Sequence, residues 1–316
     1  MKIKCPEFKI LVPIDGSEHS KRAVRFAAAY INSMRKGFKG IALVRVITGR
    51  YMYERVPYID FRSEVMKKAD SYLKFKQAHI EKNVKPSLEE CEKILIEAGI
   101  KPLEKYILEG DPADEIIKIA NEGDFSIIMM ARRGLSEIMG IILGSVTSKV
   151  VHRTLRQTVY VIGRRRFESE RSPISNILVP IDGSAYSMKG VEHCACIAQE
   201  MGELIKSITL LRVINLAFYE RMIDSGVDPE SEAMKIIDLA KDTFFKENVS
   251  KDIIRTKIRM GNPAEEIIKE NEEGNYNLIV IGRKGRTALK DLLLGGVSST
   301  VISRCQDTNI AVASFE

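Results

Sequence analysis

The chain has 316 residues, 45% of them hydrophobic, and a formal net charge of +6, values typical of a soluble globular protein with about two domains. No apolar run reaches the roughly 18–20 residues that span a bilayer, and the N-terminal stretch is predicted to be a strand rather than a signal peptide, so we expect no membrane association. The five cysteines form no Cys-x-x-Cys pair and match no histidine cluster, which favours reduced thiols in a cytoplasmic protein over disulfides or zinc.

The basic residues show no pattern typical of nucleic-acid binding. The densest run, Arg164–Arg166, falls in a polar segment near the middle of the chain. No interleaved aromatic platform, zinc-ligand spacing or recognition helix accompanies it. We interpret the run as a solvated linker and expect no nucleic-acid partner.

The sequence repeats itself. Residues Lys9–Ser17 return as Asn176–Ser184, with Ile-Leu-Val-Pro-Ile-Asp-Gly-Ser in both copies, and an Arg-Val-Ile run and a Gly-x-Pro-Ala turn also occur twice. The repeat predicts two domains, residues 1–165 and 172–316, joined by a short polar linker.

Within each copy, short apolar runs alternate with amphipathic segments. This alternation favours a parallel sheet that is covered by helices on both faces and connected by right-handed crossovers. Ligands of such sheets bind beyond the carboxyl ends of the strands. In the first copy, the expected strands are Ile10–Ile14, Ile41–Ile47, Ile100–Leu108, Ile127–Met130 and Thr158–Ile162, and the expected helices are Ser20–Met34, Asp60–Lys82, Ser87–Gly99, one that begins at Pro112 and one that follows Gly144.

A glycine-rich turn follows the fourth expected strand in both copies. Glycines allow close approach of the backbone to a ligand, and a helix N-terminus presents unpaired N–H groups, so the turn is interpreted as a phosphate cradle, or alternatively as ordinary turns and helix caps. The hydroxyl groups of this turn either donate hydrogen bonds to a phosphate or cap the following helix. Its cationic side chains either contact phosphates or are exposed loop charges. The hydroxyls are Ser145, Thr147 and Ser298, and the cations are Arg132, Arg133, Arg283 and Lys284.

An aspartate ends the first strand of each copy and precedes Gly-Ser at a helix start. Asp15 and Asp182 are therefore candidates for hydrogen bonding to a ligand such as a ribose, with an Asx turn or a helix cap as the alternative. The prolines before them, Pro13 and Pro180, are expected to shape the turn.

The sequence lacks several catalytic patterns. It has no GxxxxGK[ST] phosphate loop, no GxGxxG after the first strand, no GxSxG elbow and no metal-ligand spacing among its four histidines. We therefore expect no catalytic residues and at most slow ATP hydrolysis.

Each copy resembles a universal stress protein domain over nearly its whole length, through the repeated motifs above and a Gly-x-x-Gly-x9-Gly-[Ser/Thr] spacing after the fourth strand. The resemblance implies two tandem flavodoxin-like, Rossmann-like α/β sandwich domains, each with a five-stranded parallel sheet of order 3-2-1-4-5. It also implies pairing of the two domains through their last strands, and it is compatible with a homodimer.

The resemblance further implies that ATP or AMP is the ligand, with Mg²⁺ carried by the phosphates of ATP. The aspartates would bind ribose, the valines adenine, and the glycines and hydroxyls the phosphates. The candidate residues are Pro13, Asp15, Val46, Ala131, Arg132, Gly134, Gly144, Ser145, Val146 and Thr147 in the first copy, and Pro180, Asp182, Val213, Gly282, Arg283, Gly285, Gly295, Gly296, Val297 and Ser298 in the second.

Both copies depart from the family pattern. Ala131 replaces the first glycine of the first copy, and its Cβ would either crowd a phosphate or require an unfavourable φ. Gly296 replaces the Ser or Thr of the second copy and removes one hydroxyl donor.

These observations predict a cytoplasmic stress-response sensor or regulatory protein that binds adenine nucleotide. One alternative is a dimerisation or adaptor module that binds no nucleotide. Another is an enzyme, either a weak ATPase or an adenylyl transferase, and the missing catalytic residues argue against it.

Overall fold

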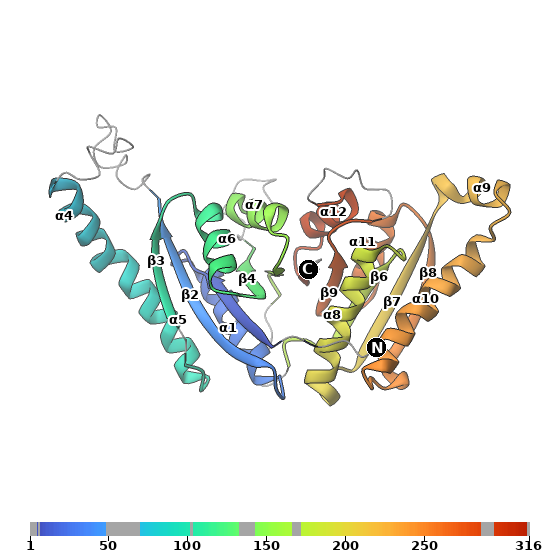
Figure 1. Ribbon diagram of the computed structural model, residues 1–316, viewed down its shortest axis with the longest axis horizontal. Helices are drawn as coiled ribbons and strands as arrows, with labels where there is room; N and C mark the ends of the chain where they lie inside the picture. The colour runs from blue at the N-terminus through green and yellow to red at the C-terminus, as the bar shows by residue number, and fades with distance from the viewer. Residues whose placement is uncertain are drawn as a thin grey trace.

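The computed structural model describes residues 5, 7–48, 70–101, 104–132, 143–165, 172–285 and 294–314. They form two α/β halves that lie side by side (Figure 1). Within these residues, no helix is both long enough and apolar enough to cross a membrane.

Each half contains a five-stranded parallel sheet. The predicted order 3-2-1-4-5 is confirmed in both halves, as β3-β2-β1-β4-β5 and as β8-β7-β6-β9-β10. The strands of the first half are β1 (Phe8–Pro13), β2 (Phe38–Ile47), β3 (Glu104–Glu109), β4 (Ile127–Ala131) and β5 (Thr158–Ile162), and those of the second are β6 (Asn176–Ile181), β7 (Ser207–Asn215), β8 (Ile254–Gly261), β9 (Leu278–Gly282) and β10 (Asn309–Ala313).

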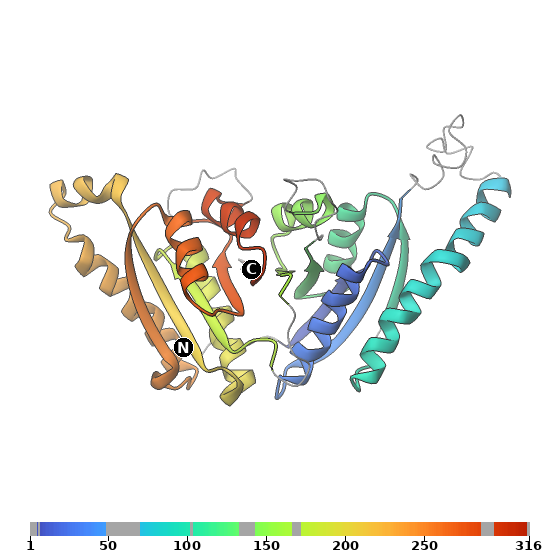
Figure 2. The ribbon, with the colours of Figure 1, turned by 180° about the vertical axis from the view of Figure 1, so that it is seen from behind.

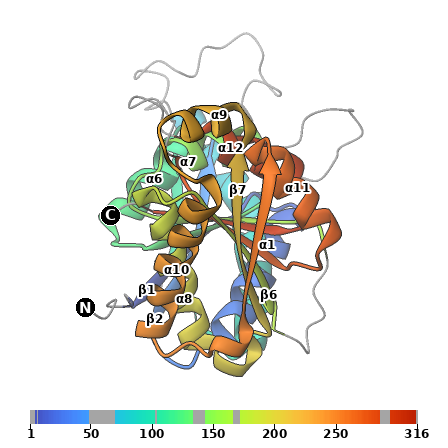
Figure 3. The ribbon, with the colours of Figure 1, turned by 90° about the vertical axis from the view of Figure 1, so that its right-hand side faces the viewer.

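Helices cover both faces of the sheet, as predicted for alternating strands and helices. The helices are α1 (Glu18–Asn32), α4 (Asp70–His79), α5 (Lys85–Glu97), α6 (Pro112–Glu122), α7 (Ser145–Arg153), α8 (Ala185–Met201), α9 (Leu216–Asp224), α10 (Pro229–Lys246), α11 (Pro263–Glu273) and α12 (Gly296–Arg304), with short 3₁₀ turns η2 (Gly202–Leu204) and η3 (Lys251–Ile253). Helices α1, α5, α8 and α10 pack on one face, and α6, α7, α11 and α12 pack on the other. Figure 2 shows α1 in blue against the strands of the first half, and Figure 3 shows α10 and α11 on opposite sides of β7.

The two halves join through their last strands, so that ten strands form one continuous sheet. Strands β5 and β10 pair antiparallel, with Tyr160 opposite Ala311. This arrangement confirms the predicted pairing within the chain. It also places α7 and α12 near each other at the centre of the molecule (Figure 1).

The seam between the halves is not symmetric on the α1 and α8 side. The Tyr160 hydroxyl lies 3.3 Å from the hydroxyl of Tyr30 on α1 and 2.8 Å from Nε2 of His193 on α8. Loss of hydration in this apolar seam lowers the pKa of His193 to about 4. His193 is therefore a neutral hydrogen-bonding partner across the seam at neutral pH.

The long helical segment before β3 differs from its prediction. Part of the expected helix Asp60–Lys82 lies outside the described residues, but from Asp70 the chain stays helical to Glu97 through a π-helical turn, η1 (Ile80–Val84). The helix predicted from Ser87 is therefore present as α5, but it begins at Lys85 and the predicted break before it is absent. Pro86 has no N–H to continue the α-helical ladder, and the π turn directly before it accommodates this loss without ending the helix.

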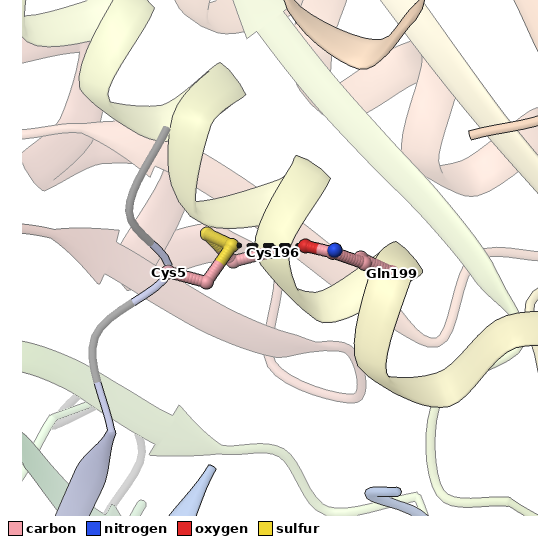
Figure 4. The surroundings of a disulfide bond; sticks show 3 residues. All are labelled: Cys5, Cys196 and Gln199. Carbon is pink, nitrogen blue, oxygen red and sulfur yellow. Dashed lines mark hydrogen bonds between the residues drawn. A yellow bond between two sulfur atoms is a disulfide. The ribbon is translucent and has the colours of Figure 1, made fainter. Parts of the chain in front are cut away.

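The expectation that all five cysteines are reduced is also wrong. Cys5 and Cys196 form a disulfide with a Cα–Cα distance of 5.4 Å, which ties the N-terminal segment of the first half to α8 of the second (Figure 4). The two cysteines are 191 residues apart, so no local spacing indicates the pair. Cys91, Cys194 and Cys305 are free and buried.

Candidate functional site

Each half has a crevice at the carboxyl ends of its central strands, where the fold predicts a ligand site. The first crevice has a volume of about 310 Å³ and the second about 490 Å³. Most of the predicted site residues line them. They are Pro13, Asp15, Val46, Ala131, Gly144, Ser145, Val146 and Thr147 in the first, and Pro180, Asp182, Val213, Gly282, Gly285, Val297 and Ser298 in the second.

The other predicted residues lie elsewhere. Gly134 lies outside the described residues. Gly295 and Gly296 begin α12 next to the second crevice without lining it. Arg132 and Arg283 do not line either crevice, and their positions are described below.

The two aspartates hold the turn that starts the following helix. In the first half, Oδ1 of Asp15 accepts hydrogen bonds from the backbone N (3.0 Å) and the hydroxyl (2.5 Å) of Ser17. In the second half, Oδ1 of Asp182 accepts one from the backbone N of Ser184 at 2.9 Å. The Asx-turn interpretation is thus correct for one oxygen of each carboxylate, and the carboxylates also line the crevices.

The Asp15 carboxylate is held in its charged form. Partial burial would raise its pKa, but the hydrogen bonds from Ser17 and Ser20 and the positive charge of Arg45 outweigh this effect and lower the pKa below its ordinary value. A charged acceptor at the end of β1 suits the hydroxyl groups of a sugar.

Helices α7 and α12 begin at the crevices without a side-chain cap. Their N-cap residues are Gly144 and Gly295, which have no side chain to accept a hydrogen bond from the N–H groups of the first turn. Helix N-termini of this kind carry a partial positive charge and donors that suit an anion.

The hydroxyls of the cradle have a structural partner. Oγ1 of Thr147 donates to the carbonyl oxygen of Ala131 at 3.4 Å, and Oγ of Ser298 donates to that of Gly282 at 2.7 Å. A hydroxyl has one proton, so these two groups tie the helix start to the strand end and do not donate to a phosphate in this arrangement. Ser145 is exposed at the start of α7.

The first glycine of the family pattern is required for helix packing. A Cβ on Gly282 would lie 2.4 Å from the backbone oxygen of Tyr186 in α8, a distance that no real Cβ tolerates. Gly190, at the facing position of α8, lies against the backbone of β9, where an added Cβ would be 3.5 Å from the N of Gly282. The first half has alanine at both corresponding positions, Ala23 and Ala131. The residue at this position therefore sets how closely a helix packs on β4 or β9. The clash between the Ala131 side chain and a phosphate stays a prediction.

The glycine at position 296 has no such constraint. A Cβ added to Gly296 would meet no atom within 4 Å. Packing therefore does not require glycine at this position, where the family pattern has a serine or threonine. Gly285 is different, because its Cβ would lie 2.7 Å from Oδ2 of Asp182.

Each crevice also contains an arginine that was not among the predicted site residues. Arg45 and Arg212 come one position before the predicted adenine-contacting valines, and both line the crevices. Nη1 of Arg45 donates to the carbonyl of Ile14 at 3.3 Å. Burial lowers the pKa of Arg45, and the carboxylate of Asp15 opposes this shift. The Arg-Val-Ile run repeated in both halves was the available signal.

The second crevice is larger and has a partial cover. Met222 of α9 and Val227 of the following turn line it, together with Glu232 at the start of α10. Nη2 of Arg212 lies 3.8 Å from Oε2 of Glu232. This crevice therefore combines an apolar wall with an ion pair.

Arg132 and Arg283 are buried between the halves, so they are neither exposed loop charges nor crevice residues. Nη2 of Arg132 donates to the carbonyl of Cys305 at 3.4 Å, and Nη2 of Arg283 donates to those of Val151 (2.5 Å) and His152 (3.2 Å). Each arginine thus binds the negative C-terminal end of the helix, α12 or α7, that begins at the other half's crevice. We leave both out of the nucleotide site.

The remaining cations of the turn divide between the two halves. Lys284 lines the second crevice, with its ammonium 5.6 Å from the centre of the Tyr186 ring. Arg133, its counterpart, lies outside the described residues.

The comparison with known families matches this architecture. The universal stress protein family matches residues 8–160 and 173–307, one segment in each half. The chain belongs to this family. The two matched segments fall within the predicted domains 1–165 and 172–316.

Individual universal stress proteins match about one half of the chain. One from Methanocaldococcus jannaschii is 29% identical over 164 residues, which are 50% of this chain and 95% of that protein. One from Thermus aquaticus is 32% identical over 146 residues, which are 45% of this chain and 89% of that protein.

Solved structures match the whole chain. The crystal structure of a universal stress protein from Archaeoglobus fulgidus covers 98% of both chains with a TM-score of 0.65 and 22% identity. A functionally unknown protein from Pseudomonas aeruginosa covers 98% of this chain and 93% of its own, with a TM-score of 0.59 and 14% identity. These likenesses support the tandem fold.

Proposed function

We propose that each crevice binds an adenine nucleotide and that the protein is a stress-response sensor or regulator with little or no catalysis. The observation that carries the proposal is the uncapped N-terminus of α7 or α12 in the same crevice as the aspartate that ends β1 or β6. Donors for a phosphate and an acceptor for a sugar hydroxyl thus line one crevice, once in each half.

The parts of the nucleotide would divide among these groups. The phosphates would accept hydrogen bonds from the N–H groups at the start of α7 or α12, and the ribose would donate to Asp15 or Asp182. The adenine would lie on Val46 or Val213, since a flat apolar base suits the apolar wall of such a crevice.

A resident metal ion has no evident protein ligands. Among the described residues, no group of three or more His, Cys, Asp or Glu side chains could hold one. Mg²⁺ would therefore enter with ATP, on its phosphates. Hydrolysis in such a site would be slow, because the sequence has no GxxxxGK[ST] phosphate loop to supply a catalytic lysine.

Calorimetric titration with ATP and with AMP tests the proposal. We expect binding of at least one of them, weakened about ten- to a hundredfold at one site by Asp182→Asn, which removes the charge that a ribose hydroxyl would meet. Lys189→Gln, a change on α8 outside the crevice lining, is the control and should leave binding unchanged. Absence of binding at millimolar ATP and AMP would favour the alternative, an adaptor module that binds no nucleotide.

A further inference from the structure

Three arginines of the first half gather where the two halves meet, outside both crevices. Arg22 lies on α1, Arg132 follows β4 and Arg164 follows β5. Nη2 of Arg22 donates to the backbone oxygen of Arg132 at 3.2 Å. The backbone N of Arg164 donates to the carbonyl of Gln306, in the turn after α12, at 3.0 Å.

The three guanidinium groups are close enough to repel one another. Burial and the charges of Arg164 and Arg22 together lower the pKa of Arg132 to about 10, although nearby Cys305 and Asp307 oppose the shift. Burial and the charge of Arg164 also lower the pKa of Arg22. Within the described part of the chain, none of the three arginines forms an ion pair with a carboxylate.

Several buried donors of this cluster have no acceptor. They are Nε of Arg22, Nε and Nη1 of Arg132, and Nε and Nη2 of Arg164. The Arg132 side chain is fully buried, with 0% of its surface exposed. Buried N–H groups in proteins are nearly always hydrogen-bonded, and charged ones are costly when they are not. A cluster of such donors on three side chains indicates an acceptor that the protein itself does not supply.

The fold does not require this cluster, because the second half lacks it. The repeat places Lys189 at the position of Arg22, and its ammonium pairs with Glu192 at 2.9 Å. Arg283 corresponds to Arg132 and also has two buried N atoms without an acceptor. Among the described residues, no second and third arginine shifts its pKa. Both halves thus have one buried arginine at a helix end. Over the described ranges, only the first half adds two further arginines beside it.

We propose that Arg22, Arg132 and Arg164 form a binding site for a tetrahedral oxyanion, of the phosphate or sulfate kind, at the junction of the two halves. The planar guanidinium fork matches the spacing of phosphate oxygens, and three forks supply more donors than a single carboxylate can use. Arg22 and Arg164 are partly exposed, so the anion reaches the cluster from solvent past these two side chains.

The bound anion would connect the two halves. Arg132 already donates to the carbonyl of Cys305 in the second half. An oxyanion on its remaining donors would add α1 and the turn after β5 to the same network. Binding at this site is expected to stabilise the seam, since a ligand of the folded state raises stability by mass action.

Calorimetry with inorganic phosphate at constant ionic strength tests the site. We expect one phosphate per chain that binds outside the crevices, with affinity reduced about ten- to a hundredfold in Arg164→Gln and in Arg22→Gln. Lys189→Gln, the matched change in the second half, should leave this binding unchanged. Equal phosphate affinity in wild type, Arg22→Gln and Arg164→Gln, or no binding at millimolar phosphate, would overturn the proposal.

Two further measurements are informative. One identifies the source of the anion, and the other tests whether Arg164 has a purely structural role. Sulfate that competes with phosphate indicates a free ion, whereas stronger competition by a phosphomonoester indicates the phosphate group of a larger molecule. Without phosphate, Arg164→Gln should unfold at the same temperature as wild type or higher, because it relieves repulsion. A lower unfolding temperature of that variant, with unchanged phosphate affinity, would assign the arginine to structure alone. ATP binding should persist in Arg164→Gln, so this test is independent of the crevices.

Discussion

Acid should weaken the seam between the two halves through one histidine. The pKa of His193 is about 4 in the folded protein, against an ordinary value of 6.5. Between these two values the unfolded chain takes up a proton that the folded protein does not bind. The stabilisation is therefore present above the ordinary pKa and is lost as the pH falls from about 6.5 towards 4.

The size of the effect follows from the two pKa values. Proton linkage gives a loss of about 2 kcal/mol in the free energy of unfolding between about pH 7.5 and about pH 5. Because the imidazole keeps some contact with solvent, we expect the measured loss to be about 1–2 kcal/mol. Other groups titrate in the same range, so the quantity of interest is the difference between wild type and a variant.

His193→Gln provides that difference. Its amide can still hydrogen-bond to the hydroxyl of Tyr160 but does not titrate. Urea unfolding should show that the free energy of unfolding falls between about pH 7.5 and about pH 5 in both proteins. The fall should be smaller in the variant than in wild type, by about 1–2 kcal/mol. An equal fall in the two proteins would refute the reasoning.

Three further predictions concern packing and the cross-links between the halves. Gly282→Ala should lower the free energy of unfolding by about 1–3 kcal/mol, because its Cβ meets the backbone of α8, while Gly296→Ala in open space should change it little in urea unfolding. Gly163→Ala places a Cβ 2.3 Å from a backbone oxygen of the facing half, so limited proteolysis should cut the linker faster than in wild type. Non-reducing peptide mapping should recover Cys5 linked to Cys196, and Cys5→Ser should remove a reductant-sensitive stability of about 2–4 kcal/mol.

Much of the fold could be predicted from the repeat. Five apolar runs per half, each flanked by a helical pattern, define the strands, and Thr158–Ile162 was placed at its observed bounds. The resemblance to a known family supplied the strand order. The uninterrupted helix through η1 could not be predicted, because Pro86 normally indicates a helix boundary and the π turn depends on tertiary packing.

The site was predicted in part. Spacing along the chain placed Asp15 and Val46 at the carboxyl ends of neighbouring strands, and both line the first crevice. It could not show where side chains point. The arginines after β4 and β9 turn into the seam, and the hydroxyls of Thr147 and Ser298 turn back to a strand end. Both outcomes depend on contacts with segments distant in sequence, as does the pairing of Cys5.

Both crevices are proposed to hold an adenine nucleotide. Native mass spectrometry with ATP and AMP would count the bound molecules directly, in wild type and in Gly285→Val, whose side chain would displace the Asp182 carboxylate. We predict up to two nucleotides on the wild-type chain and one fewer on the variant, with a cooperative thermal unfolding transition to show that the variant is folded. Wild type without nucleotide at millimolar concentrations, or equal occupancy of wild type and variant, would contradict this account.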